Sequence, residues 1–272
     1  MTQTKVQTVT DAVETTRGDR VTYDLRGSGP ALVFVAGAGP HRAEDPWTTE
    51  TAKRAAALGL TTLVFDRLGR GDSPADGRLD LDRELDVIAT LIDVVGGSAV
   101  LCGHSSGCSI SLRAADAGLP VTGLALWEAP LETPADETRA WTDGFEALLD
   151  ADDVVGALEY YMQDMAPEWI EGMKAAPDWP ASAAVSRSYR ADAQSLAWAQ
   201  AALEDGSLAS IAVPVLAMYG AETFPGMAEA AQAIADVVPG AQARQVPGAM
   251  HMWEPQPMAE TLATFVRGIG GH

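Results

Sequence analysis

Hydrophobic and polar positions alternate in blocks of strand length and helix length along most of the chain. Up to Thr16 polar and apolar residues alternate, and after Arg17-Gly18-Asp19 a second such block covers residues 20–25; both predict strands joined by a turn. Beyond residues 27–30 the strand-length runs are continuously apolar, which is typical of strands buried on both faces. These runs are 31–35, 61–65, 99–102, 121–127, 213–219 and a weaker one at 243–246.

Segments of helix length separate these apolar runs. They cover residues 47–57, 81–95, 227–237 and 258–269. Regular alternation of strand and helix predicts an α/β fold with a mostly parallel sheet, right-handed crossovers and helices on both faces. Ligands of such sheets bind at the carboxyl ends of the strands.

The alternation breaks between Trp127 and Ile211, where no convincing strand is found. Amphipathic helical patterns at 134–149, 154–165 and 191–204 replace it, together with four of the seven tryptophans, Trp141, Trp169, Trp179 and Trp198. We expect a core domain of residues 1–130 and 211–272 and a helical cap insertion of residues 131–210. Most of the aromatic residues should pack the insertion onto the core domain, and a few should line an apolar pocket.

Composition limits the classes of partner. With 272 residues, 47% hydrophobic and 21% charged, the chain can bury a large core, and disorder is not expected. Its net charge of −20 disfavours nucleic acid and anionic membranes, so we expect a small-molecule substrate. The first residues show no secretory signal pattern, and the two cysteines do not suit a disulfide framework, so a cytoplasmic location is expected. Nothing in the sequence indicates the oligomeric state.

The strongest chemical signal is Gly103-His104-Ser105-Ser106-Gly107, between an apolar strand and a helical pattern. In that context G-x-S-x-G forms a nucleophile elbow, in which small residues two before and two after the serine permit a sharp turn. Ser105 would then be exposed on a strained backbone, with a helix N-terminus favouring developing negative charge. The structural alternative is a glycine-rich turn with an incidental serine.

With this motif in place, the sequence resembles the α/β-hydrolases over most of its length, and in particular their serine hydrolase or esterase branch with a helical cap. The resemblance implies an eight-stranded, mostly parallel sheet. The segment 66–73, Asp-Arg-Leu-Gly-Arg-Gly-Asp-Ser, resembles the loop after the fourth strand in many bacterial members. That loop is mainly architectural, so we do not expect Asp66, Arg70 or Asp72 to be catalytic.

A serine nucleophile needs a base, and the chain has four histidines. His104 belongs to the elbow and should point away from Ser105, His272 is the last residue, and His41 follows the wrong strand. His251 remains, between the last short strand and the final helix, where the resemblance places the catalytic histidine. A buried structural histidine is the alternative role for it.

The third member of a triad is less plain. In the family an acid usually follows the seventh strand, but that stretch reads Gly220-Ala221-Glu222-Thr223, with threonine at the expected position. Some members, haloalkane dehalogenases among them, carry the acid after the sixth strand, where this chain has Glu128. A carboxylate ending an apolar strand is costly unless paired, so we prefer Glu128 and keep Glu222 as the alternative.

An oxyanion hole needs two backbone N–H donors. By position in the resemblance, Ser106 and Ala38 supply them, although the usual His-Gly of the second loop reads Ala36-Gly37 here. Four further residues lie beside these candidates in the sequence, and we expect them to contact substrate: Gly37, His41, Trp127 and Met250.

The sequence therefore predicts a serine hydrolase of a carboxylic ester, lactone or thioester that needs no cofactor or metal. Its substrate should be small and apolar or aromatic. Dehalogenases and epoxide hydrolases of this fold use a carboxylate nucleophile, against which Ser105 argues. Two alternatives stay open: a carbon–carbon bond hydrolase using the same Ser–His pair, and a non-catalytic ligand-binding protein on the same scaffold.

Overall fold

A computed structural model describes residues 6–165 and 167–269. Within these ranges the strands form one sheet in the order β1-β2-β4-β3-β5-β6-β7-β8-β9. Pairing is parallel from β4 through β8 and antiparallel at both edges, so the predicted mostly parallel sheet is confirmed. The strands are β1 (Thr8–Glu14), β2 (Arg20–Arg26), β3 (Ala31–Val35), β4 (Thr61–Phe65), β5 (Ala99–His104), β6 (Val121–Trp127), β7 (Val215–Glu222), β8 (Gln242–Ala249) and β9 (Met252–Trp253). The two-residue β9 adds a ninth strand to the eight expected.

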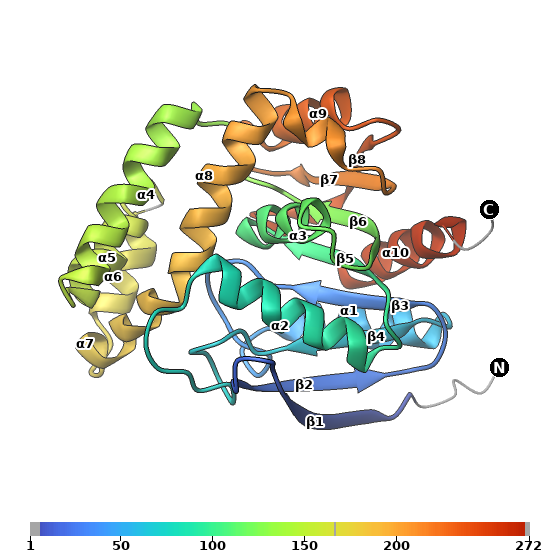
Figure 1. The fold of residues 1–272 in the computed structure, drawn as a ribbon, viewed down its shortest axis with the longest axis horizontal. Coiled ribbons are helices and arrows are strands. Elements are labelled where there is room, and N and C mark those ends of the chain that lie inside the picture. Colours follow the sequence, from blue (N-terminus) through green and yellow to red (C-terminus); the bar gives the residue numbers. More distant parts are fainter. Residues whose placement is uncertain (1–5, 166, 270–272) are drawn as a thin grey trace.

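Helices cover both faces of this sheet (Figure 1). Alternate residues of β3 show why its sequence is apolar throughout: Val33 and Val35 belong to one hydrophobic cluster, and Leu32 and Phe34 to another. The first cluster includes residues of α2 (Leu81–Val94), α3 (Ser106–Asp116) and α9 (Met227–Val237), and the second includes residues of α1 (Pro46–Ala57) and α10 (Pro255–Ile269). A strand covered on both faces by helices is therefore mostly apolar at successive positions.

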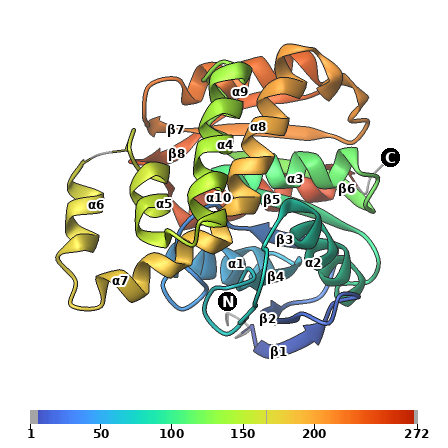
Figure 2. The same cartoon turned by 60° about the vertical axis from the view of Figure 1, so that its left-hand side comes forward.

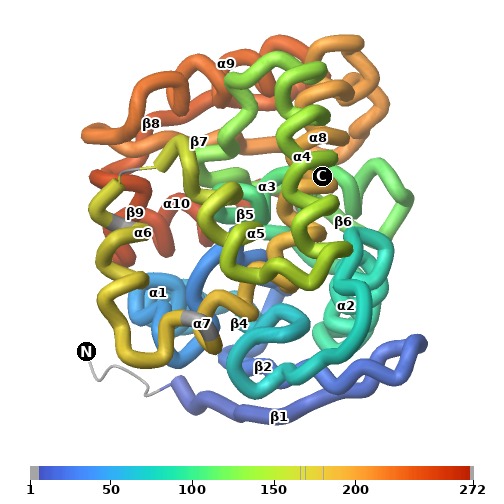
Figure 3. Tube along the Cα trace, turned by 90° about the vertical axis from the view of Figure 1, so that its left-hand side faces the viewer, coloured from blue at the N-terminus to red at the C-terminus, as the bar shows by residue number. Residues whose placement is uncertain are grey.

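Residues 131–210, called the helical insertion below, join β6 to β7. They form α4 (Ala135–Asp150), α5 (Val154–Tyr161), α6 (Pro167–Lys174), α7 (Trp179–Ser182) and α8 (Arg190–Glu204), with short 3₁₀ helices at Ala183–Tyr189 and Ser207–Ser210. The pattern predicted one helix over 154–165, but α5 ends at Tyr161, and α6 and α7 were not predicted. Figures 2 and 3 show the insertion at one end of the sheet, with α4 and α5 in front of the strands when seen from that side.

The helical insertion has its own small core. Phe145, Tyr161 and Tyr189 pack together with ring centroids about 5 Å apart, and Trp141 stacks on Phe145. Helix α8 lies between this cluster and the rest of the molecule (Figure 1), and it contributes Leu196 and other residues to the core of the sheet.

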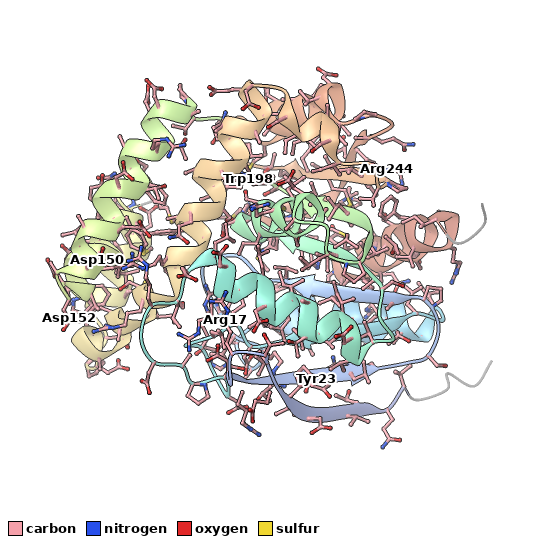
Figure 4. All side chains as sticks on the ribbon, viewed as in Figure 1. Arg17, Tyr23, Asp150, Asp152, Trp198 and Arg244 are labelled. Atoms are coloured by element: carbon pink, nitrogen blue, oxygen red, sulfur yellow. The ribbon has the colours of Figure 1, made fainter. Side chains whose placement is uncertain are left out.

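Charged side chains hold the helical insertion together and join it to the rest of the molecule. Asp150, at the end of α4, forms ion pairs with Arg190 at 2.5 Å and with Arg78 at 3.0 Å. Trp198 of α8 lies beside α3, where the Arg113 guanidinium is 5.3 Å from its ring centre (Figure 4). Across the part of the chain that the structure describes, no helix is long and apolar enough to cross a membrane. His272 lies outside the described residues.

Candidate active site

Ser105 occupies the sharp turn between β5 and α3. Its φ of 55° and ψ of −129° are unfavourable for any residue with a Cβ, and its N–H donates to the carbonyl of Trp127 at 2.9 Å. Glycines on both sides make the turn possible. A Cβ at Gly103 would lie 2.6 Å from backbone atoms of Cys108, and one at Gly107 would lie 2.1 Å from the carbonyl oxygen of Val35. The local sequence therefore builds the strained strand-turn-helix geometry of a nucleophile elbow.

His251 and Glu128 come together from two different strand ends. The Nδ1 atom of His251 is 2.6 Å from Oε2 of Glu128, a short hydrogen bond of the charge-assisted kind. The other carboxylate oxygen, Oε1, accepts the backbone N–H of Gly220 at 2.9 Å. Because Nδ1 is held by the carboxylate, the other ring nitrogen, Nε2, is the one available to exchange protons with a substrate or nucleophile.

The Glu128 carboxylate is buried yet favours its charged form. Burial raises its pKa, but the hydrogen bonds from His251 and the Gly220 N–H, together with the Thr223 hydroxyl, outweigh burial and lower the pKa below its ordinary value. The side chain is fully covered, with no exposed area. The alternative acid, Glu222, is exposed at the end of β7, and its backbone carbonyl accepts the Met250 N–H. The structure therefore pairs Glu128, rather than Glu222, with His251.

The side chains of Trp127, which is buried, and His104, which is partly buried, hold the backbone of His251. Its φ of 70° is left-handed, and its carbonyl lies 3.1 Å from the indole nitrogen of Trp127 and 3.0 Å from Nε2 of His104. Burial, and then the neighbouring His251, lower the pKa of His104 to about 4, so at neutral pH its uncharged ring can donate one hydrogen bond. Trp127 has no exposed area. The expectation that Trp127 contacts substrate is therefore wrong: it supports the site from below, because its strand is buried on both faces.

The loop after β3 lies against the elbow. A Cβ at Gly37 would be 2.9 Å from Cβ of Ser105 and 2.7 Å from the His104 carbonyl oxygen, so only glycine permits this approach. Ser106 begins α3, so its N–H has no partner within the helix. The Ala38 N–H donates to Oγ of Ser106 at 3.0 Å. One of the two N–H groups expected to form an oxyanion hole thus already has an acceptor in this structure.

Comparisons with known proteins identify the family of the chain. The model of a family described as the alpha/beta hydrolase family matches residues 32–264. The chain belongs to the alpha/beta hydrolase family. An alpha/beta hydrolase from Sphaerobacter thermophilus is 31% identical, with a TM-score of 0.72 over 94% of this chain and 99% of that one. No curated protein matches the chain.

More distant structures share the fold alone. An esterase from Thermogutta terrifontis is 19% identical, with a TM-score of 0.64 over 97% of this chain and 99% of its own. A haloalkane dehalogenase variant from Bradyrhizobium elkanii is 18% identical, with a TM-score of 0.63 over 97% of each chain. Since the fold carries different chemistries, activity has to be argued from the site of this hydrolase.

Two further residues expected to contact substrate, Met250 and His41, are at least partly exposed near the candidate site. Met250 is 71% exposed and directly precedes His251. His41 is partly exposed, 3.4 Å from a carboxylate oxygen of Glu44, and lines a small cavity with His104 and Trp253. A partly exposed residue that the sequence did not single out, Phe224, has its ring centre 6.1 Å from that of His251.

The segment 66–73 has the architectural contacts expected of it, and it also has one that was not expected. Asp66 is buried and accepts the backbone N–H groups of Arg42 and Asp72. Arg70, in contrast, reaches Asp192 of the helical insertion at 3.0 Å. Sequence reasoning missed Asp192, because its partners lie more than 80 residues away. Among the described residues, no group of three or more His, Cys, Asp or Glu is arranged to hold a metal ion.

Proposed function

We propose that this alpha/beta hydrolase cleaves carboxylic esters, lactones or thioesters with Ser105 as the nucleophile, His251 as the general base and Glu128 as the triad acid. One observation carries the proposal: a covered carboxylate bonds Nδ1 of a histidine, and a strained serine stands at the adjacent strand end. Nucleophile, base and orienting acid are the three parts that serine catalysis requires.

In the proposed reaction, Oγ of Ser105 attacks the carbonyl carbon while Nε2 of His251 takes the hydroxyl proton. Glu128 stabilises the imidazolium that forms, and backbone N–H groups of Ser106 and Ala38 stabilise the oxyanion. Collapse of the tetrahedral intermediate breaks the bond to the leaving group, which receives the proton from His251. Water, activated by the same imidazole, then hydrolyses the acyl-Ser105 ester and releases the acid.

The surroundings of His251 favour an uncharged, apolar substrate. Met250 and Phe224 place apolar surface beside the imidazole, where a bulky acyl or alcohol group would lie. The net charge of −20 repels anionic substrates in the bulk field of the protein. We therefore propose neutral esters with an aliphatic or aromatic substituent as the substrate class.

The direct test is active-site labelling with a fluorophosphonate, which reacts with activated serines. We expect stoichiometric loss of nitrophenyl acetate and butyrate hydrolysis, with the adduct on Ser105. Tandem mass spectrometry separates Ser105 from its neighbour Ser106, which serves as the internal control. Ser105→Ala should abolish both labelling and turnover, and His251→Gln should slow both by orders of magnitude.

Two outcomes would contradict the proposal. The first is folded protein that is not labelled on Ser105 at concentrations at which serine hydrolases react. The second is ester turnover that survives in Ser105→Ala at the wild-type rate. Protein that is unfolded by heat before labelling is the control. It should form no adduct on Ser105, because labelling depends on the folded site.

A further inference from the structure

A buried cluster of charged side chains lies between the helical insertion and the loop after β3. It contains two cations, Arg67 and Arg70, and two anions, Glu84 of α2 and Asp192 of α8, each with 4% or less of its surface exposed. Arg67 pairs with Asp192 at 2.5 Å and with Glu84 at 3.0 Å, and Arg70 pairs with Asp192 at 3.0 Å. The charges balance, which is the condition under which such groups can be buried together.

The two arginines also donate hydrogen bonds to backbone carbonyl oxygens of one short stretch of the chain. The carbonyl oxygen of Gly37 accepts from Arg70 at 2.5 Å and from Arg67 at 3.3 Å, and that of Ala36 accepts from Arg67 at 3.1 Å. The Gly37 carbonyl and the Ala38 N–H belong to the same peptide unit. Because a trans peptide is planar, holding the carbonyl in one direction points the N–H in the opposite one.

The N–H of that peptide is also linked to the same cluster of charged side chains, through the hydroxyl of Ser106. The Ala38 N–H donates to Oγ of Ser106 at 3.0 Å, and the Ser106 hydroxyl donates to Oδ1 of Asp192 at 2.7 Å. One carboxylate therefore orients the peptide from both ends, through Arg70 at its carbonyl and through Ser106 at its N–H. Asp192 has no exposed area, so water does not compete for these bonds.

We propose that Asp192, a residue of the helical insertion, is a positioning residue that fixes the Gly37–Ala38 peptide, so that the Ala38 N–H, which bonds Oγ of Ser106 here, is also shared with the oxyanion formed on Ser105. This inference rests on the proposed serine hydrolase function. It gives the helical insertion a second role besides covering the strand ends. Any movement of α8 is transmitted through Asp192 to the oxyanion loop, so the insertion and the reaction are coupled. Asp192 itself touches neither substrate nor Ser105.

Asp192→Asn tests the proposal, with Glu84→Gln as its matched control. Both changes replace a buried carboxylate of the same cluster by an amide, but Glu84 bonds only the Nε side of Arg67 and not Ser106. We expect Asp192→Asn to lower kcat for a nitrophenyl ester by on the order of 10- to 100-fold with KM within about twofold, because the oxyanion forms only in the transition state. Glu84→Gln should stay within about threefold of wild type.

A second measurement separates positioning from general damage to the fold. An alkyl boronic acid, whose tetrahedral adduct on serine resembles the oxyanion, should bind Asp192→Asn more weakly by the same factor as the loss in kcat. Equal kcat and equal boronate affinity in Asp192→Asn and Glu84→Gln would overturn the inference. If Asp192→Asn does not fold, Arg70→Lys keeps the positive charge but removes the forked contacts, and full kcat in that variant would equally overturn it.

The wild-type protein keeps this test apart from the test of function. If wild type is neither labelled by the fluorophosphonate nor active on esters, the proposed function fails, and the inference fails with it. If wild type is labelled and active while Asp192→Asn behaves like Glu84→Gln, only the inference about Asp192 fails.

Discussion

The carboxyl ends of the strands and the helical insertion are held in place by different interactions. At the strand ends, Ser105, Glu128 and His251 all have positive φ, and Met250 does as well. Hydrogen bonds from Trp127 to the His251 carbonyl and from the Gly220 N–H to the Glu128 carboxylate hold these strained positions. The helical insertion has one such non-glycine residue among those described, Asp152, and stacked aromatic side chains hold it together.

The contrast indicates which region of this hydrolase has a tightly fixed backbone geometry. Backbone strain of order 1–3 kcal/mol per residue persists only where the surroundings determine the geometry, and three of the five described non-glycine residues with positive φ are the candidate catalytic residues. Aromatic packing in the helical insertion tolerates changes of shape more easily than a network of fixed donors and acceptors. Asp192 of the helical insertion contacts Arg70 and also Ser106, the residue next to the candidate nucleophile Ser105. A substitution of this carboxylate therefore tests whether the insertion affects catalysis.

The largest expected effect separates the two candidate acids. Glu128→Gln should lower kcat for ester hydrolysis about 10²- to 10⁴-fold, because the imidazolium loses its charged partner and Nδ1 its fixed proton. Glu222→Gln, the same change at the exposed last residue of β7, should leave kcat within about twofold. Steady-state kinetics of both variants decide the matter. The reverse order of effects would move the triad acid to Glu222.

The helical insertion can be loosened without loosening the sheet. Phe145 is fully buried in the aromatic cluster, so Phe145→Ala should cost about 3–5 kcal/mol there. Hydrogen exchange followed by mass spectrometry should show amides of α5 exchanging much faster, while those of β5 keep most of their protection. Equal acceleration in α5 and β5 would mean that the two regions unfold as one cooperative unit.

Acid should lower the stability of the folded protein through His104, which lies at the end of β5. Its pKa of about 4 in the folded protein lies below the ordinary 6.5, so between these pH values the unfolded chain takes up a proton that the folded protein does not. Stability therefore falls as the pH drops from 6.5 to 4, by about 3 kcal/mol from this group. The lowered pKa of Glu128 acts in the same direction, below its ordinary value of 4.5.

Urea unfolding at a series of pH values measures this contribution. His104→Gln should flatten the decline between pH 6.5 and 4. Trp127→Phe removes the other donor to the His251 carbonyl but leaves His104 to titrate, so its decline should stay as steep as that of wild type. An unchanged slope in His104→Gln would assign the acid sensitivity to other groups.

The smallest expected effect measures the strain at Ser105. Both Ser105→Ala and Ser105→Gly remove the nucleophile, but only glycine adopts a φ of 55° and ψ of −129° without a Cβ penalty. Ser105→Gly should therefore be more stable than Ser105→Ala by about 1 kcal/mol. Thermal or denaturant unfolding of the two variants compares them directly, and equal stabilities would show that the elbow is not strained.

Much of the sheet could be predicted from the sequence. The ranges 31–35, 61–65 and 121–127 agree with β3, β4 and β6 residue for residue, because strands buried on both faces are rich in apolar and β-branched residues. The helical insertion was harder: α6 and α7 were missed, since short helices without a long amphipathic period leave little pattern. The strand β9 has only two residues, too few to form a pattern of hydrophobic and polar positions.

Local pattern by itself predicted the turn at Ser105 and the alternation of strands and helices, and elimination together with the family resemblance singled out His251 among four histidines. Glycine spacing and chain order carry that information, because they constrain the backbone within a few residues. Only the tertiary structure showed that Glu128, rather than Glu222, contacts His251, that Trp127 is buried, and that Asp192 is joined to the loop at Gly37. Those outcomes depend on hydrogen bonds between residues far apart in the chain, whose geometry is fixed only once the strands and helices have packed.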